Sequence, residues 1–405
     1  MRGAGWVLSG NVVYAASQWA VVVALAKLTD PATVGLFALA LALTAPVYAL
    51  LNLNLRNVLA TDASDRHPLS DYAVLRAGAL VAALPIIGAV AVALGYGGAS
   101  LRIVMWIGLC KAIESAADLG YGLYQHSERL DRLGRSMGGR GVCILVAFVG
   151  ALWWTGSLEV ALAAWAGAQL AVVVTLDLPA IRRLWRVSDA RARPLLLAQT
   201  AAPLGLVIFL SSLSSSVPRA ALEQWVGPYE LGIFAAFVWL VRVGQTAVRS
   251  VGQAMIAGLA RKYSAADRSG FLAASWGLVG MSAALGALGV VVAELFGPTL
   301  LRLMYTPDYA EHASLFTWVM VAGGVSYVAW FLTQLNTAAR QFTLQVPIAV
   351  AVAVATVAAA FVLVPEWGAR GAALSWLAGA LTEVVCGGWL FGRAVSSLAL
   401  AEGST

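Results

Sequence analysis

Four polar residues in the second half of the chain recur at helical spacing inside an apolar segment. Arg242, Gln245, Arg249 and Gln253 are separated by three, four and four residues, which places them on one face of a helix. Arginine stays charged in proteins, and its planar guanidinium group binds two phosphate oxygens at once. The stripe therefore predicts a surface for an anionic group. A competing interpretation is that these side chains snorkel to a membrane surface. It stays open for Arg249 and Gln253, but it fails for Arg242, which lies about halfway along its segment.

Charged residues also share one face of an apolar segment in the first half. Lys111, Glu114 and Asp118 follow each other at helical spacing, and Lys111 and Glu114 are close enough in sequence to pair within the helix. Asp118 then needs either a proton or an arginine from another helix, and the sequence leaves both open. Glu383 is the only charged residue of segment 371–392. An ionisable residue at membrane depth favours a functional site, so all four are candidates for ion or proton coupling.

Sequence signatures of cofactors and catalysis are missing. The three lysines follow Ala, Cys and Arg, so there is no phosphate-binding loop ending in Gly-Lys-Ser/Thr. The three histidines lie in separate connecting segments without a partner at metal-ligand spacing. Asp62 and Asp65 form the nearest carboxylate pair, and we interpret them as a solvated loop. We therefore expect no cofactor, no metal and no enzymatic activity.

The surrounding elements are predicted to be membrane helices. Hydrophobic residues make up 60% of the 405 residues and charged residues only 11%, about half of the ~25% usual in globular proteins. This composition excludes a soluble enzyme, a disordered chain and a nucleic-acid-binding protein, and it predicts an all-α integral membrane protein. About twelve segments are apolar and long enough to span a bilayer. They are residues 6–26, 33–53, 75–95, 101–123, 140–156, 158–178, 199–223, 230–250, 271–293, 313–335, 343–363 and 371–392.

The basic residues predict the orientation of these helices, because they favour cytoplasmic loops. With the amino terminus inside, the outside connections hold only Lys27, Arg102, Arg302 and Arg370. The cytoplasmic side holds most of the arginines, among them Arg76 and Arg140 at the inner ends of segments 75–95 and 140–156. We therefore expect both termini in the cytoplasm.

An internal repeat organises the predicted helices. Pro31-Ala-Thr-Val-Gly35-Leu-Phe37-Ala38 returns 197 residues later as Pro228-Tyr-Glu-Leu-Gly232-Ile-Phe234-Ala235. Six helices separate the copies, so the halves have the same orientation and a pseudo-two-fold axis along the membrane normal. The predicted lobes are residues 1–193 and 194–405. A turn at Gly368 and Gly371 is expected to let the last helix start close against the one before it.

The repeat also predicts the binding residues. The offset aligns Arg242, Gln245, Arg249 and Gln253 with Ala45, Tyr48, Asn52 and Arg56, a second polar stripe on segment 33–53. Under the two-fold relation, both stripes line one central cavity. Arg219 aligns with Val22 and is expected to line that cavity too, the alternative being the outer surface. The predicted substrate-binding residues are Tyr48, Asn52, Arg56, Arg219, Arg242, Gln245 and Arg249.

Several short motifs then resemble a known family. In the first half they are Gly10-Asn11, Gln18-Trp19, Leu25-Ala-Lys27-Leu, Gly35-Leu-Phe37-Ala, Pro46, Asn52-Leu-Asn-Leu-Arg56, Thr61-Asp62, Asp71-Tyr72-x-x-x-Arg76 and the loop from Tyr121 to Ser136. In the second half they are Pro218-Arg219, Gly232-Ile-Phe234-Ala and Gly368-x-x-Gly371-Ala-Ala. These motifs resemble the bacterial polysaccharide-unit flippases, the Wzx-type branch of the MOP exporter superfamily.

The resemblance implies a MATE/MOP-like pair of six-helix lobes around a cavity that opens alternately to each side. It implies translocation of an undecaprenyl pyrophosphate-linked oligosaccharide to the outer leaflet of the bacterial inner membrane, for O-antigen (lipopolysaccharide), capsule or exopolysaccharide synthesis. Family arginines map onto Arg56 and Arg242. The implied partners are the lipid-linked substrate, membrane lipids, and a polymerase and glycosyltransferases of the same pathway, with no nucleic acid. Peptidoglycan-precursor flippases usually have two further helices, which argues against that branch.

Two other functions remain open. A drug/cation antiporter of the MATE type shares the two-lobe plan, but it is expected to line its cavity with acidic rather than basic residues. A membrane glycan polymerase is the enzymatic alternative. It would need a substantial outside loop, and the longest candidate, about residues 294–312, is short.

Overall fold

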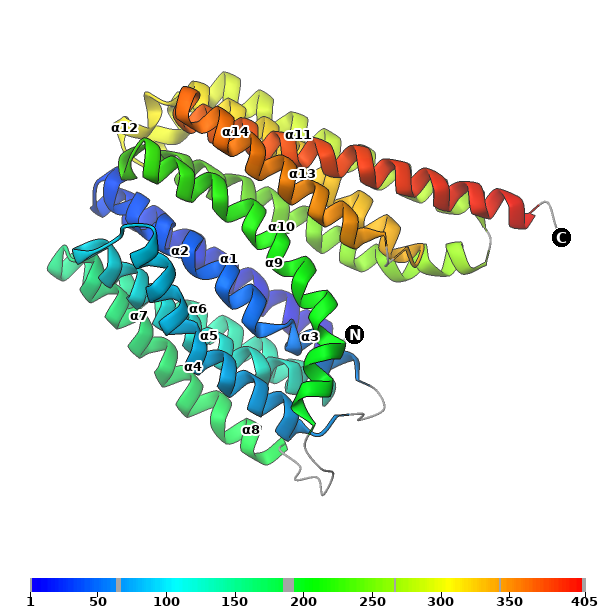
Figure 1. The fold of residues 1–405 in the computed structure, drawn as a ribbon, viewed down its shortest axis with the longest axis horizontal. Coiled ribbons are helices and arrows are strands. Elements are labelled where there is room, and N and C mark those ends of the chain that lie inside the picture. The colour runs from blue at the N-terminus through cyan, green and yellow to red at the C-terminus, as the bar shows by residue number, and fades with distance from the viewer. Residues whose placement is uncertain (1, 63–66, 185–192, 266, 342–343, 403–405) are drawn as a thin grey trace. The chain divides into compact units, whose positions relative to one another are not determined.

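The computed structural model describes residues 2–62, 67–184, 193–265, 267–341 and 344–402, without the side chains of 2–4, 247, 253, 254, 257 and 397–402. These residues form helices and no strand (Figure 1). The helices are α1 (Arg2–Leu28), α2 (Pro31–Asn52), α3 (Leu55–Thr61), α4 (Leu69–Ala93), α5 (Gly98–His126), α6 (Leu130–Thr155), α7 (Leu158–Val172), the π-helix η1 (Val173–Asp177), α8 (Leu178–Leu184), α9 (Pro194–Trp225), α10 (Pro228–Ser264), α11 (Arg268–Met304), α12 (Pro307–Ala310), α13 (Ala313–Ala338) and α14 (Gln345–Glu402). The predicted all-α membrane fold is confirmed.

Ten of these helices are long and apolar enough to cross a membrane. Helix α14 was predicted as two spans, and it folds back on itself at Gly368, whose φ of 52° lies in the left-handed region that favours glycine. After this turn Gly371 lies against the carbonyl of Leu363, and Gly379 lies against Thr356. Helix α5 is 29 residues long, but it carries charged residues along its length. The ten helices include α14, which supplies two spans, and α5 adds one more. All twelve predicted spans are therefore helical in the described part of the chain.

The two copies of the repeat begin helices in the same way. Pro31 and Pro228 occupy the first turns of α2 and α10, where proline costs no hydrogen bond. Asp30 caps α2 by accepting a hydrogen bond of 2.7 Å from the Thr33 amide. The phenylalanines of the two copies, Phe37 and Phe234, are both buried. The repeated motif thus fixes a helix start and an inward-facing aromatic residue.

The chain divides into two compact units, Met1–Ser216 and Val217–Thr405. In the first unit α5 is central, because α2, α3, α4 and α7 all pack against it. In the second unit α10, α11 and α14 pack against α13. Helices α5 and α13 are the fourth and tenth of the predicted spans, so both units use the corresponding helix as their centre.

Helix α9 crosses the boundary between the units. Its first turns belong to the first unit, since Leu197 and Ala201 join a buried cluster with Leu55, Tyr72 and Leu123. The Arg193 amide, just before α9, donates a hydrogen bond of 2.8 Å to the Asp71 carboxylate. The packing boundary therefore lies within α9, whereas the predicted lobes were divided before it.

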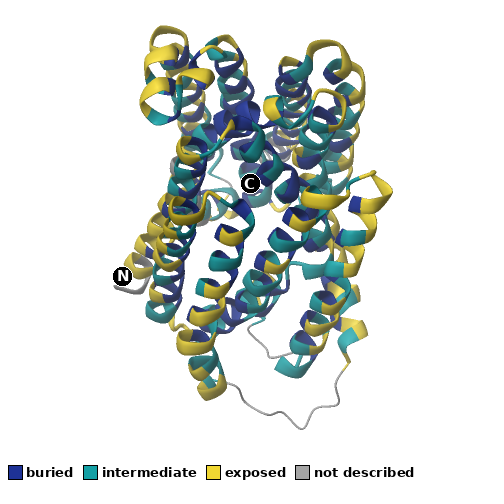
Figure 2. Cartoon of the chain, turned by 90° about the vertical axis from the view of Figure 1, so that its left-hand side faces the viewer, coloured by how far each residue is buried: buried dark blue, intermediate teal, exposed yellow. Residues whose placement is uncertain are grey.

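Small residues allow the closest helix contacts within each unit. Gly10 of α1 lies against Gly134 of α6, and Gly286 of α11 lies against Gly324 of α13. Membrane helices associate through such close contacts because lipid provides no hydrophobic driving force between them. Figure 2 shows buried and exposed residues alternating along the same helices. The exposed ones include large apolar side chains such as Val81, Val146 and Val385, as expected for faces turned toward lipid.

Candidate functional site

A break after α2 decides where Arg56 lies. Leu53 and Asn54 both adopt the left-handed conformation, with φ of 47° and 53°, and they separate α2 from the short helix α3. Arg56 is therefore on α3, so the helix that carries the predicted stripe is interrupted after Asn52. All three side chains nevertheless contact α5: Tyr48 at Gly108, Asn52 at Ser115 and Arg56 at Asp118.

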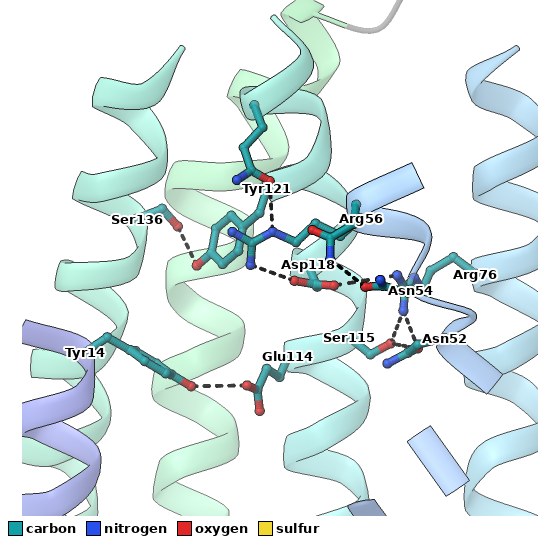
Figure 3. Close-up of polar contacts among 12 residues, drawn as sticks. Tyr14, Asn52, Asn54, Arg56, Arg76, Glu114, Ser115, Asp118, Tyr121 and Ser136 are labelled. Carbon is teal, nitrogen blue, oxygen red and sulfur yellow. Dashed lines mark hydrogen bonds and ion pairs between the residues drawn. The ribbon is translucent and has the colours of Figure 1, made fainter. Parts of the chain in front are cut away.

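Arg56 and Arg76 share the carboxylate of Asp118 (Figure 3). Arg56 Nη1 lies 3.1 Å from Asp118 Oδ1, and Arg76 Nη2 lies 3.9 Å from Asp118 Oδ2. Of the two alternatives that the sequence left open for Asp118, a proton or an arginine of another helix, the structure shows arginines from α3 and α4. Arg56 Nε also donates a hydrogen bond of 3.1 Å to Gln125 Oε1. The guanidinium carbon of Arg56 lies 5.3 Å from the centre of the Tyr121 ring.

Arg76 is held by Asn52 and Ser115. Its Nη1 donates hydrogen bonds to the Asn52 side-chain oxygen and, at 2.7 Å, to the Ser115 hydroxyl. The Ser115 hydroxyl in turn donates a hydrogen bond of 2.6 Å to the same oxygen of Asn52. The sequence predicted Arg76 at the cytoplasmic start of its helix, but α4 begins at Leu69, six residues earlier than predicted, so Arg76 lies well inside it. The missed signal is spacing: Arg76 continues the helical series of the buried residues Ala79 and Ala83.

The predicted pair on α5 is confirmed. Lys111 Nζ lies 2.6 Å from Glu114 Oε2. The other oxygen of Glu114 accepts a hydrogen bond of 3.3 Å from the Tyr14 hydroxyl of α1. Glu114 therefore links α5 to α1 as well as to its own helix.

A second buried pair was not predicted. Arg140 of α6 and Asp177 of η1 lie 3.1 Å apart, and each side chain is 1% exposed. The Tyr124 hydroxyl also donates a hydrogen bond of 3.4 Å to the Asp177 carboxylate. The sequence predicted Arg140 as the first residue of its helix, at the cytoplasmic end, but α6 begins earlier, at Leu130. Asp177 owes its position to a π-turn, a feature found often at functional sites.

Tyr48 has a local partner. It is buried, and its hydroxyl donates a hydrogen bond of 2.8 Å to the Gly108 carbonyl. This bond joins α2 to α5 inside the first unit. The cavity-lining role predicted for Tyr48 stays a prediction.

Three arginines of the second unit, Arg219, Arg242 and Arg249, lack an acidic partner among the described residues. Arg219 and Arg242 are half-buried and Arg249 is exposed. Arg242 stacks 4.6 Å from the Trp239 ring centre, and Arg249 lies 6.0 Å from that of Trp330. Within the described part of the chain, none of the three forms a salt bridge. Arg242 lies close enough to both of the other arginines for their charges to repel.

The remaining predicted residues of this unit are less constrained. Gln245 is half-buried one turn from Arg242, and the Gln253 side chain lies outside the described residues. Glu383 accepts a hydrogen bond of 2.8 Å from Thr333 across α13 and α14. No group of three or more acidic, histidine or cysteine residues that could hold a metal occurs among the described residues.

The two units thus differ in their charge balance. Each cation of the first unit's interior, from Arg56 to Arg140, has a carboxylate within 4.0 Å. Arg219, Arg242 and Arg249 of the second unit form no salt bridge with a described carboxylate, so their charges are available to another group. The second unit is therefore suited to hold an anion. That both stripes line one cavity stays a prediction.

Comparison with known proteins supports the family resemblance. No protein-family model matches the chain. The capsular polysaccharide biosynthesis protein CapF of Staphylococcus aureus is 23% identical over 389 residues, covering 93% of this chain and 95% of CapF. The predicted resemblance to the polysaccharide-unit flippases of the MOP superfamily is confirmed, at low identity.

Solved structures show the same fold. The lipid II flippase MurJ, in an inward closed conformation, matches 97% of this chain and 90% of its own with a TM-score of 0.73 and 9% identity. An inward-facing multidrug resistance MATE transporter of the MOP superfamily matches 97% and 95% with a TM-score of 0.68 and 15% identity. A MOP superfamily transporter from Pyrococcus furiosus gives a TM-score of 0.65 at 15% identity, over 97% of this chain and 94% of its own. The chain is a multi-pass membrane protein with this transporter fold.

Proposed function

We propose that the protein is a flippase for a lipid-linked oligosaccharide. Its cargo is an undecaprenyl pyrophosphate-linked repeat unit, which it moves by alternating access from the cytoplasmic to the outer leaflet of a bacterial inner membrane. The proposal places both termini in the cytoplasm. It also places a polymerase and glycosyltransferases of the same pathway beside the protein. The full-length similarity to CapF supports a role in polysaccharide biosynthesis.

The observation that carries the proposal is the row of arginines Arg219, Arg242 and Arg249. The positive charge of Arg242 repels those of Arg219 and Arg249. None of the three forms a salt bridge in the described chain. A cation at membrane depth is costly, so it normally faces a partner or a polar cavity. A pyrophosphate supplies the missing negative charge, and its oxygens match the paired N–H groups of guanidinium.

The test is complementation of cells that lack the protein. Arg242→Ala should abolish transfer of the lipid-linked unit across the membrane, because the half-buried guanidinium in the middle of the row is lost. Arg393→Ala is the matched control: Arg393 also stacks on a tryptophan of its own helix, 5.1 Å from the ring centre of Trp389. Both variants should reach the membrane in wild-type amounts. Wild-type flipping by Arg242→Ala would remove the central claim.

Drug or cation export is the second candidate, because MATE transporters share the fold. A cation exporter needs a carboxylate free to bind its cargo. Here Glu114, Asp118 and Asp177 are paired with basic residues. Glu383 accepts only a threonine hydroxyl among its described contacts. Drug sensitivity of the deletion strain with a normal lipid-linked glycan profile would favour this function.

A further inference from the structure

We infer that Arg56 and Arg76 form a phosphate seat in the first unit, and that the carboxylate of Asp118 occupies this seat until a ligand displaces it. The pyrophosphate class of ligand rests on the proposed function. The seat itself rests on contacts among α3, α4 and α5.

The geometry of the carboxylate supports its role as a stand-in. Its two oxygens do not share one guanidinium group: Oδ1 lies 3.1 Å from Arg56, and Oδ2 lies 3.9 Å from Arg76. Two oxygens of one phosphate can bridge the same pair of arginines. The 3.9 Å separation is too long for a hydrogen bond, so Asp118 satisfies Arg76 by charge alone.

Arg76 has unused hydrogen-bonding capacity. Its side chain is 4% exposed, and both Nε and Nη2 are buried without a hydrogen-bond partner among the described residues. A buried donor left unsatisfied is costly. The remaining nitrogen, Nη1, is bound to Asn52 and Ser115, which fixes the unused N–H groups in place. A phosphate is a stronger acceptor than the distant carboxylate and would satisfy them.

The seat is preorganised and its occupant is accessible. Gln125 and the Tyr121 ring hold Arg56, so little side-chain entropy is lost when a ligand binds. Asp118 is 32% exposed and Arg56 24%. The carboxylate can therefore rotate away into solvent without breaking the buried contacts of Arg76.

The experiment measures binding of inorganic pyrophosphate to the full-length protein in lipid nanodiscs by calorimetry. Asp118→Asn should bind pyrophosphate about tenfold more tightly than the wild type, the equivalent of one hydrogen bond to a charged group. Adding Arg56→Gln to Asp118→Asn should remove the gain. Glu159→Gln is the matched control, because it also frees an arginine, Arg102, from a 2.9 Å salt bridge, but on the exposed surface. The control should bind like the wild type.

Several outcomes would overturn the inference. Unchanged binding in Asp118→Asn and Asp118→Ala would show that the carboxylate blocks no anion site. An equal gain in Glu159→Gln would show a general charge effect. Loss of the folded protein in both Asp118 variants would also overturn it, because a group displaced in every cycle cannot be required for folding.

A second ligand identifies the source of the phosphate. Geranyl pyrophosphate that binds Asp118→Asn more tightly than inorganic pyrophosphate supports a lipid-linked ligand, and equal binding supports a free one. Either result confirms the seat, provided that adding Arg56→Gln abolishes the binding. The flipping assay with Arg242→Ala is independent of these titrations, so failure of the proposed function and failure of the seat are distinguishable.

Discussion

At the scale of single residues, the pair of Arg140 and Asp177 is the most deeply buried salt bridge among the described residues of the first unit. Both side chains are 1% exposed, and they join α6 to η1. Two desolvated charges of this kind depend on each other, since removing one leaves the other unpaired. This pair therefore belongs to the framework, whereas Asp118 and Arg56 are partly exposed, as the proposed phosphate seat requires.

Asp177→Ala should destabilise the protein by about 3–5 kcal/mol, because it leaves the Arg140 charge buried and unpaired. Thermal unfolding in detergent, followed by size exclusion, measures the effect. Glu159→Ala removes one partner of the exposed pair with Arg102, which is 59% exposed, and should cost about 0–1 kcal/mol. Similar losses in the two variants would contradict the framework role.

At the scale of elements, glycines set the distance between α1 and α6. A Cβ atom on Gly134 would lie 2.0 Å from the Trp6 carbonyl oxygen, and one on Gly141 would lie 2.9 Å from the Tyr14 Cα. This close approach also places Tyr14 within reach of Glu114. The glycines therefore position part of the polar interior.

Gly134→Ala should push α1 away from α6 and weaken both their packing and the bond between Tyr14 and Glu114. The expected result is a lower unfolding temperature and faster proteolysis of α1. Gly139→Ala, on the same helix, has nothing within 4 Å of the added carbon and should be neutral or slightly stabilising, since alanine favours helix. Equal unfolding temperatures and proteolysis rates for the two variants would mean that the close contact at Gly134 does not stabilise the packing of α1 on α6.

The start of α11 depends on a charged cap. Asp267 accepts a hydrogen bond of 2.8 Å from the Gly270 amide and lies 3.4 Å from Lys262. The Gly270 amide above all, with the Lys262 contact, lowers the pKa of Asp267. A lowered folded-state pKa means that the stabilisation is complete above the unfolded value of about 3.9. It is lost as the pH falls through the folded value.

The pH dependence of Asp267→Ala tests this cap. The variant should be less stable than the wild type at neutral pH, and the difference should shrink as the pH falls below about 4. Thermal unfolding at a series of pH values measures the difference. A gap that stays constant down to the lowest pH would mean that the carboxylate charge contributes nothing.

At the scale of the whole molecule, the turn at Gly368 sets the number of spans. Helix α14 has 58 residues, about 87 Å at 1.5 Å per residue, which far exceeds the ~30 Å hydrocarbon core. The contacts of Gly371 with Leu363 and of Gly379 with Thr356 show two antiparallel halves. Two spans here keep the predicted total even, so we expect the two termini on the same side.

Reporter fusions test this topology. An enzyme that is active only outside the cytoplasm should be active when inserted after Trp367 and inactive when fused after Thr405. The basic residues of the loops predict this orientation. Activity at both positions, or at Thr405 alone, would contradict the predicted orientation of the last two spans.

The sequence by itself determined the helices, the repeat, the turn at Gly368 and the pair of Lys111 and Glu114. Each of these follows from local rules: apolar length, proline and glycine positions, or spacing on one helix. The charged stripe on α10 was also visible because its residues share one face. These features need no knowledge of which helix packs against which.

Only the tertiary structure decided the partners of the charged residues. In the sequence Arg76 and Arg140 lie at the predicted starts of their helices, but α4 and α6 begin earlier, and packing against neighbouring helices buries both side chains. After the left-handed pair Leu53 and Asn54, Arg56 lies on α3 and pairs with Asp118. Spacing reports which residues share a face of one helix, whereas an ion pair between helices depends on their packing. The three-dimensional structure alone therefore shows which arginines of the described chain pair with a carboxylate.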